Sequence, residues 1–295
     1  MDQAEHLRKK AQEHRDKAAM ERSPLVEGRP VRVISITSGK GGVGKTNISA
    51  NLALALAKLG KKVLVFDTDL GLANVDLLLG IKPQYTIQDV LDGGKTIQDV
   101  VARGPDGVLV LPASSGIDEV PDLTEEERLD LVAQFENWDE PIDVMLLDTG
   151  AGIGKNVMYF NIVAQHILVV VTPEPTSMTD AYALIKVLYT RYQEKRFNLL
   201  VNMVRDEKEA LGVFRAIADT ADRFLDLSIN YFGFVPLDPN VTRAVQKRQP
   251  LLHAYPHSPA AQTFANLAKN VLDLEIPTSP KGNIQFLWRH VLRVG

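Results

Sequence analysis

The chain has 295 residues, of which 45% are hydrophobic, so it is long enough to bury a full core. It contains no cysteine, which excludes disulfides, thiolate zinc sites and cysteine-held iron–sulfur clusters. The formal net charge of −4 gives no general attraction to nucleic acid, and DNA is not an expected partner. No run of 18 apolar residues occurs and the N-terminus lacks the apolar region of a signal peptide, so we expect a cytoplasmic protein.

Sequence patterning predicts one domain with two appended ends. Residues 1–23 carry many charges of both signs and indicate a solvated helix or a flexible arm. Residues 24–275 form the predicted domain, because strand and helix patterns alternate there without a linker-like break. Residues 276–295 are the predicted hinge and a short amphipathic helix.

A glycine-rich loop at residues 38–46 lies between a predicted strand at 31–37 and a predicted helix that follows. From Gly39 the sequence fits the pattern G-x-x-x-x-G-K-[ST]. Glycines let the backbone turn its N–H groups onto phosphate oxygens, beside the positive end of the helix dipole. The order of strand, loop and helix favours a phosphate-binding loop over a glycine turn that binds nothing.

Three side chains of this loop have separable expected roles. Lys45 is the expected point charge for the β and γ phosphates, and Thr46 offers a hydroxyl to Mg²⁺. Lys40 has no necessary role in the same cradle, because Lys45 already occupies its phosphate end. Lys40 is therefore either a solvated loop lysine or a group that a neighbouring molecule uses.

The string Lys-Gly-Gly-Val-Gly-Lys-Thr at residues 40–46 resembles the deviant Walker A loop of MinD/ParA-like ATPases. The resemblance implies an α/β fold of the P-loop NTPase type, with a single doubly wound, mainly parallel sheet flanked by helices. It implies an ATP hydrolase with ATP or ADP and Mg²⁺ as ligands, and a Lys40 that crosses to the phosphates of a second subunit in an ATP-dependent homodimer. Asn47 departs from the threonine common in that family, which leaves a contact near the α-phosphate open. The expected nucleotide-binding loop residues are Gly39, Lys40, Gly41, Gly42, Val43, Gly44, Lys45, Thr46 and Asn47.

Two carboxylates, Asp67 and Asp69, end the next predicted strand. Parallel strands deliver functional groups at their carboxyl ends, so both should face the phosphates. The stretch from Asp67 to Asp76 resembles the D-x-D-x-G-L-x-N-x-D segment of MinD-like ATPases. By that resemblance Asp69 orients the attacking water, whereas Asp67 supports the metal shell and the switch. Either carboxylate alternatively caps the following segment.

A later apolar strand, starting at residue 142, ends at Asp148 and is followed by glycines. This is the Walker B arrangement, in which a carboxylate holds Mg²⁺, usually through water. Gly150 and Gly152 would let the loop move when the γ-phosphate leaves. Together with the loop at 38–46, the strand predicts a magnesium-dependent site.

The remaining predicted site residues come from the second half of the chain. The pattern T-P-E-P-x-S-x-x-D ends at Asp180, which by resemblance lies near the dimer and partner surface, although a first-turn carboxylate complementing a helix dipole explains it equally well. Predicted strands at 197–204 and 231–238 carry Asn202, Pro236 and Asp238. In the resembled family these strand ends frame adenine; the alternatives are an asparagine turn and a proline-led helix cap.

The C-terminal segment is predicted to form an amphipathic helix with cationic residues on its polar side. Its length gives only marginal attachment to an anionic membrane, which two copies in a dimer would strengthen. The alternative is a terminal helix that docks on its own domain. The expected membrane-contacting residues are Ile284, Leu287, Trp288, Val291 and Leu292.

The opening Asp-Gln-Ala-Glu-His-Leu-Arg resembles the start of the FlhG branch of MinD-like ATPases. The resemblance implies an arm that stimulates the FlhF GTPase and contacts with flagellar switch (C-ring) proteins, at the inner face of the membrane near a cell pole or flagellar base. The expected partner-contacting residues of this arm are Asp2, Gln3, Leu7 and Arg8. The function implied is a switch that controls flagellar number and placement. A solubilising tail for the arm, and for the protein a ParA-like DNA-segregation ATPase, a MinD-like division-site regulator or a scaffold whose hydrolysis is incidental, stay open.

Overall fold

The computed structural model describes residues 31–69, 74–113 and 123–275. The predicted arm residues Asp2, Gln3, Leu7 and Arg8 lie outside the described residues. The same holds for the predicted membrane-contacting residues, which are Ile284, Leu287, Trp288, Val291 and Leu292. None of the described helices is long and apolar enough to cross a membrane.

The described part of the chain folds around an eight-stranded sheet in the order β3-β4-β2-β5-β1-β6-β7-β8. All neighbouring strands are parallel except β3, which runs antiparallel to β4 at one edge. The predicted fold, a single, mainly parallel sheet, is therefore confirmed. The strands are Arg32–Ser38 (β1), Val63–Asp67 (β2), Ala102–Arg103 (β3), Leu109–Leu111 (β4), Val144–Ala151 (β5), His166–Val171 (β6), Phe197–Val204 (β7) and Ile229–Pro236 (β8).

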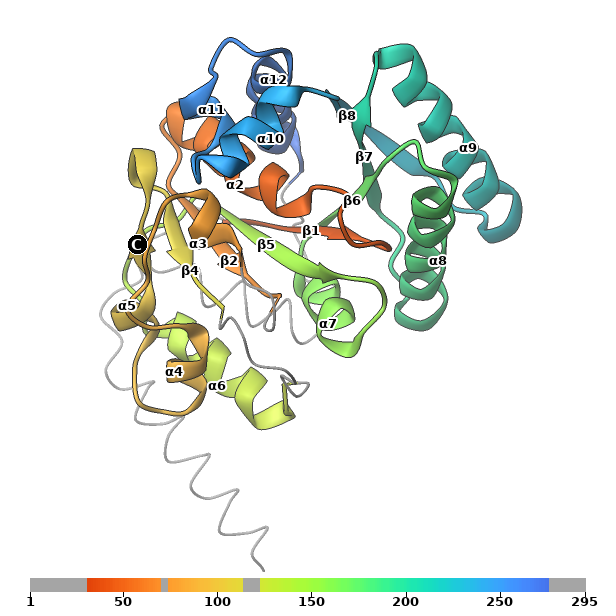
Figure 1. Cartoon of the computed structure of the whole chain (residues 1–295). Helices are drawn as coiled ribbons and strands as arrows, with labels where there is room; N and C mark the ends of the chain where they lie inside the picture. The colour runs from red at the N-terminus through yellow and green to blue at the C-terminus, as the bar shows by residue number, and fades with distance from the viewer. Residues whose placement is uncertain (1–30, 70–73, 114–122, 276–295) are drawn as a thin grey trace, which may run out of the picture.

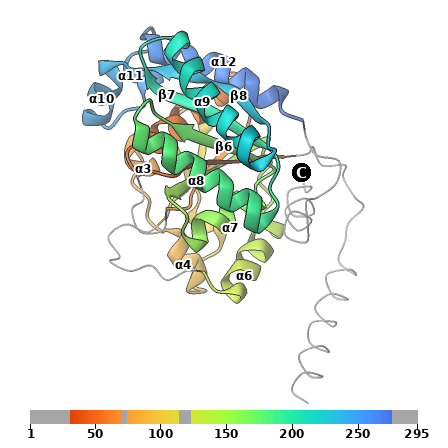
Figure 2. The ribbon, with the colours of Figure 1, turned by 90° about the vertical axis from the view of Figure 1, so that its right-hand side faces the viewer.

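Helices cover both faces of the sheet (Figures 1 and 2). On one face lie α2, α3, α10, α11 and α12, and on the other face lie α4 to α9. Their bounds are Lys45–Lys58 (α2), Val75–Leu78 (α3), Ile87–Leu91 (α4), Ile97–Val100 (α5), Glu125–Glu136 (α6), Lys155–Val163 (α7), Pro175–Tyr192 (α8), Glu207–Leu225 (α9), Pro239–Gln246 (α10), Leu251–Ala254 (α11) and Pro259–Asp273 (α12), with a 3-10 turn at Pro105–Gly107.

Strand side chains alternate between these two helical layers. In β1, Ile34 and Ile36 pack with α2 and α12, whereas Val33 packs with the cluster beneath α6 and α7. Because successive strand residues point to opposite faces, a strand that is buried on both sides is mainly apolar, and in β1 the buried Ser35 and Thr37 are exceptions. This is why β2, β5 and β6 appear in the sequence as nearly continuous apolar runs.

The two ends of the parallel strands have different roles. The carboxyl ends of β1, β2 and β5 carry the glycine loop and its carboxylates. At the other end, the Arg32 guanidinium donates to the carbonyls of Leu272 and Leu274, and His166 Nε2 lies 2.8 Å from the Glu275 carbonyl. The end of α12 is thereby anchored at the amino ends of β1 and β6, whereas the glycine loop follows the carboxyl end of β1.

Candidate functional site

The glycine loop after β1 is held by its own polar groups. Ser38 Oγ donates to the Lys40 carbonyl over 2.7 Å, and Lys45 Nζ donates to Ser38 Oγ over 3.0 Å. Gly42 and Gly44 have φ values of 79° and 92°, in the region that favours glycine. The loop therefore curls immediately before α2 begins at Lys45, and the N-terminus of that helix lies at its mouth.

Asn202, at the end of β7, fixes the loop from the side. Its amide Nδ2 donates to the Val43 carbonyl over 2.8 Å, and its Oδ1 accepts from the Met203 backbone N–H over 2.9 Å. A Cβ placed on Gly44 would lie 2.5 Å from the same Nδ2. The amide expected to meet adenine is thus also a brace for the phosphate loop, a role that the sequence did not reveal.

The start of α8 lies against the other side of the loop. A Cβ on Gly39 would lie 2.1 Å from the Asp180 carbonyl oxygen, so only glycine permits this approach. The Lys40 ammonium leaves the cradle and contacts Glu174 Oε2 at 2.6 Å and Thr176 Oγ1 at 2.8 Å. Asp180 itself is half-buried on α8, and neither of its predicted roles is tested by this placement. Sequence reasoning assigned no role to Glu174 and Thr176, although both lie in the pattern that pointed to Asp180.

The carboxylate of Asp148 lies buried in the second half of β5, which ends at Ala151, beside the loop. Its Oδ1 accepts from Ser49 Oγ over 2.8 Å. Burial raises the pKa of Asp148 to about 6, and Asp69 acts in the same direction, whereas hydrogen bonds from Ser49 and Thr46 and the charge of Lys45 lower it. The predicted residues Thr46 and Asp148 are therefore brought together.

Asp67 lies next to Asp148, since these two residues are register partners in β2 and β5. Its Oδ1 accepts from the Asp69 N–H over 3.1 Å, and its Oδ2 accepts from the N–H groups of Asn74 and Val75 over 3.0 and 3.3 Å. Burial, and then the neighbouring Asp148, raise the pKa of Asp67 well above its usual range. Asp67 thus organises the backbone on both sides of residues 70–73, as the capping alternative required.

Asp69 is half-buried beside the last residues of β5. A Cβ on Gly150 would lie 3.4 Å from Asp69 Oδ1, which places the carboxylate against the segment that follows Asp148. Burial raises the pKa of Asp69, whereas the charge of Lys45 lowers it. For Lys45, burial lowers the pKa, because it disfavours the charged ammonium, whereas the charges of Asp148 and Asp69 raise it. The fold therefore brings Lys45, Asp69 and Asp148 close enough for their charges to interact.

The donor set fits a nucleotide with Mg²⁺. Asp148 is a buried carboxylate grouped with the hydroxyls of Thr46 and Ser49, and oxygen groups of this kind are the ones that Mg²⁺ prefers. The curled glycines and Lys45 supply donors for phosphate oxygens. No group of three or more histidine, cysteine or acidic side chains forms an all-protein metal site within residues 31–69, 74–113 and 123–275. The arrangement suits a cation that keeps its waters and is held mainly by phosphates.

Asn161 joins β1 to α7 through a buried polar network. Its Oδ1 accepts from Ser35 Oγ over 2.8 Å, while its Nδ2 lies 3.1 Å from Thr37 Oγ1 and 2.8 Å from the Val157 carbonyl. The side chain is fully buried, so every one of these bonds replaces a bond to water. This contact spans more than 120 residues of sequence and had no signal in the motifs.

The residues predicted at the adenine side lie at the ends of β7 and β8. Pro236 closes β8, and Asp238 is buried as the N-cap of α10, where its Oδ1 accepts from Asn240 N–H and its Oδ2 from Ala260 N–H. Asp238 thereby joins the starts of α10 and α12, as the helix-cap alternative required. Sequence reasoning missed two exposed apolar side chains at these strand ends, Met203 and Leu237, which are 38% and 66% exposed.

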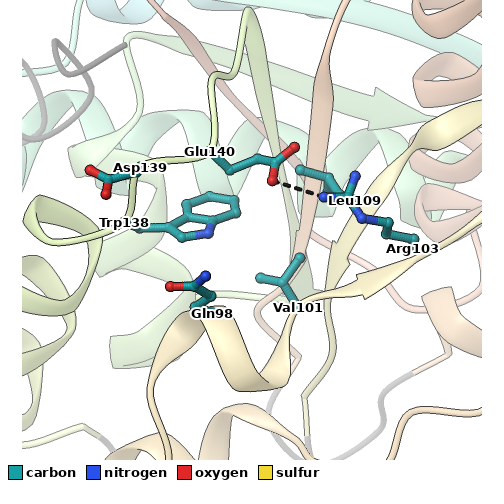
Figure 3. Close-up of a pocket in the computed structure, with 7 residues that line it drawn as sticks. All are labelled: Gln98, Val101, Arg103, Leu109, Trp138, Asp139 and Glu140. Carbon is teal, nitrogen blue, oxygen red and sulfur yellow. Dashed lines mark hydrogen bonds and ion pairs between the residues drawn. The ribbon is translucent and has the colours of Figure 1, made fainter.

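A separate cavity of about 220 Å³ lies at the β3 edge of the sheet (Figure 3). Its lining includes Trp138, Gln98 and the ion pair between Arg103 and Glu140, at 2.8 Å. None of the predicted site residues lines it. The chemistry of the loop and its carboxylates therefore lies elsewhere in the fold.

Comparisons with known proteins agree with this geometry. Residues 34–251 match the family model described as CobQ/CobB/MinD/ParA nucleotide binding domain. The chain is 45% identical to the antiactivator FleN of Pseudomonas aeruginosa, over 87% of this chain and 92% of FleN. It is 34% identical to the flagellum site-determining protein YlxH of Helicobacter pylori, over 89% of this chain and 90% of YlxH. Among solved structures, it is similar to the septum site-determining protein MinD of Pyrococcus horikoshii complexed with Mg-ADP, with a TM-score of 0.65, 26% identity and coverage of 82% and 96% of the two chains.

Proposed function

Because the chain belongs to the CobQ/CobB/MinD/ParA nucleotide-binding family and is a MinD-like ATPase, we propose that it is an ATP-dependent switch that dimerises, attaches reversibly to a membrane and controls flagellar placement. The observation that carries this proposal is that the two lysines of the loop point to different places. Lys45 points into the phosphate cradle, whereas Lys40 leaves it and lies on the outer lip. A positive charge on the lip is available to a second molecule.

The cradle residues bind and orient the triphosphate of ATP. Backbone N–H groups of the curled loop and of the start of α2 are the proposed donors to the phosphate oxygens. Lys45 neutralises the β and γ phosphates, and Thr46 with Asp148 would hold Mg²⁺. When bound, Mg²⁺ supplies charge neutralisation at the phosphates. Met203 and Leu237 offer an apolar surface to the base, beside Asn202, Pro236 and Asp238.

Asp69 is the proposed group that orients the attacking water. It lies against the segment that follows Asp148 and near enough to Lys45 for the two charges to interact. Asp67 holds the backbone N–H groups of Asp69 and Asn74, so it sets the position of Asp69 rather than acting on the water itself. Hydrolysis is then mainly a matter of positioning and charge neutralisation.

Dimerisation is proposed to place Lys40 of each subunit at the phosphates of the other. The γ-phosphate distinguishes ATP from ADP, so a dimer held by this contact depends on the nucleotide state. Asp180, close to the same lip on α8, is a proposed contact for the second subunit or for a partner. The relative named as an antiactivator and the one named as flagellum site-determining support a regulatory output of this switch.

Membrane attachment is proposed to use residues 276–295, with Leu287 and Trp288 among the apolar contacts. The end of α12 is fixed at the amino ends of β1 and β6, away from the phosphate loop and from the proposed dimer contact. Each short helix would bind weakly, and two held in one dimer would gain from effective concentration. The arm at residues 1–23 is the proposed stimulator of the FlhF GTPase, with Gln3 as its central residue, and flagellar switch proteins are further proposed partners.

The test is co-sedimentation of the full chain with anionic liposomes in ATP and in ADP, alongside a Trp288→Glu variant. We expect wild-type protein to sediment in ATP, to stay in the supernatant in ADP, and to lose binding when Trp288 is replaced. Equal sedimentation in both nucleotides would contradict a nucleotide-dependent switch. GTP hydrolysis by FlhF, measured with wild-type chain and with Gln3→Ala, tests the arm in the same preparation.

A further inference from the structure

The ammonium of Lys40 is held in place by the first turn of another helix. Glu174 is the N-cap residue of α8, and its Oε2 lies 2.6 Å from Lys40 Nζ. Thr176, within the first turn, places Oγ1 at 2.8 Å from the same atom. Glu174 lies 134 residues from Lys40 in the chain, so only the fold brings these groups together.

The close approach of the loop to α8 makes this arrangement rigid. The Asp180 carbonyl would lie 2.1 Å from a Cβ on Gly39, the residue directly before Lys40. The backbones on both sides of the pair are therefore in contact and cannot separate without disturbing the packing. Glu174 and Thr176 therefore act on a lysine whose neighbouring backbone is held against α8, and they hold its ammonium.

The pair lies where a second molecule can reach it. The side chain of Lys40 is 37% exposed and that of Glu174 is 65% exposed. An ammonium group has three N–H donors, and Glu174 and Thr176 take two of them. Within the described residues, Glu174 and Thr176 are the protein acceptors that Lys40 Nζ contacts, which leaves its third donor for an incoming acceptor.

We propose that Glu174 and Thr176 are positioning residues for Lys40, and that the Glu174 carboxylate competes with the phosphates of a second subunit for its ammonium. This inference rests on the proposed ATP-dependent dimer. In the single subunit, Glu174 neutralises Lys40 and keeps it at the lip. A triphosphate from the facing subunit carries more negative charge than one carboxylate and displaces it, whereas a diphosphate lacks the terminal group.

This competition predicts in which direction, and by how much, a substitution of Glu174 changes the affinity of the dimer. Exposed ion pairs contribute little, so removing the charge of Glu174 should tighten the ATP-dependent dimer by about two- to fivefold. Glu174→Gln keeps an oxygen acceptor and nearly the same shape, and so it removes mainly the charge. Glu174→Asp keeps the charge and should restore wild-type behaviour. Glu207→Gln is a matched control, because Glu207 is an exposed glutamate in the first turn of the neighbouring helix α9.

The experiment combines two measurements on the full-length chain. The first is the dimer dissociation constant in ATP by analytical ultracentrifugation. The second is the rate at which an amine-reactive reagent labels Lys40 in ADP, read by peptide mass spectrometry. We expect Glu174→Gln to lower the dissociation constant about two- to fivefold and to raise Lys40 labelling by a similar factor, with Glu174→Asp and Glu207→Gln close to wild type.

The two measurements separate this inference from the proposed function. If wild-type protein dimerises in ATP and Glu174→Gln leaves both readouts unchanged, the competition is wrong and the switch stands. If wild-type protein stays monomeric in ATP, the proposed dimer is wrong and the competition falls with it, while increased labelling in Glu174→Gln would still establish that Glu174 positions Lys40. A weaker dimer in Glu174→Gln would also overturn the competition, because it would mean that the carboxylate assists assembly.

Discussion

Asn202 donates its side-chain amide to the carbonyl of Val43 over 2.8 Å, across 159 residues of sequence. The end of β7 therefore sets the shape of the phosphate loop. The same amide nitrogen would lie only 2.5 Å from a Cβ on Gly44, which adds a steric reason for glycine to the one given by its φ of 92°. A residue expected to face the base thus also acts on the phosphate end of the site.

Replacement of Asn202 by aspartate tests which of these roles dominates. The change puts a carboxylate oxygen opposite the Val43 carbonyl, so we expect ATP affinity to fall by roughly tenfold or more, in line with the loss of one buried hydrogen bond. Affinity for inorganic tripolyphosphate should fall in parallel, because the loop itself is disturbed. Both affinities are measured by competition with a fluorescent nucleotide.

The control for this change is Asn230→Asp, at an exposed position on the neighbouring strand β8. It should leave both affinities unchanged. A selective loss of ATP binding in Asn202→Asp, with tripolyphosphate unaffected, would show that the amide reads the base and does not brace the loop.

Two glycines of the same loop should respond differently to alanine. A Cβ at Gly39 meets the Asp180 backbone carbonyl at 2.1 Å, whereas a Cβ at Gly41 meets nothing within 4 Å. We expect Gly39→Ala to lower the free energy of unfolding by about 2 kcal/mol or more, because two backbone segments must separate. Gly41→Ala should change it by less than about 1 kcal/mol, with either sign. Urea unfolding of the nucleotide-free variants measures both, and similar losses in the two would contradict the close approach of α8.

The buried carboxylate of Asp148 predicts a pH dependence of stability in the nucleotide-free and magnesium-free chain. Burial raises its pKa from 3.8 to about 6, so the folded state binds more protons than the unfolded state between these values. The stabilising contribution is therefore fully present below about pH 3.8 and is lost as pH rises through about 6. We expect a loss on the order of 1–3 kcal/mol in the free energy of unfolding over this range.

Urea unfolding in EDTA at several pH values checks this prediction. Asp148→Asn should remove most of the decrease, because an amide does not titrate. Asp139→Asn, at an exposed position, is the control and should keep the wild-type slope. A wild-type slope that survives in Asp148→Asn would mean that another group, such as the buried Asp67, dominates.

Local patterns were sufficient to predict much of this site. The glycine loop, the strand before it and the aspartates at the ends of β2 and β5 are each specified by a short run of residues. Parallel strands bring their carboxyl ends to one edge, so Lys45, Asp69 and Asp148 were expected together and are found together.

Contacts between distant segments were not predictable in this way. Asn161 joins Ser35 and Thr37, Asn202 joins Val43, and Glu174 joins Lys40, each across more than 120 residues. Each pairing depends on how a helix or strand end is placed against β1 and its loop, and no periodicity or motif encodes that placement. One sequence alone gave these polar side chains only local alternatives, such as caps and turns.

Sedimentation velocity of the wild-type chain and of Lys40→Ala, each in ATP and in ADP, tests the central claim most directly. Both proteins should bind nucleotide with similar affinity, because Lys45 and not Lys40 occupies the cradle. We expect wild-type protein to sediment as a dimer in ATP and as a monomer in ADP, and Lys40→Ala to stay monomeric in both. A Lys40→Ala variant that still dimerises in ATP as wild-type protein does, or a wild-type chain whose oligomeric state ignores the nucleotide, would contradict the account.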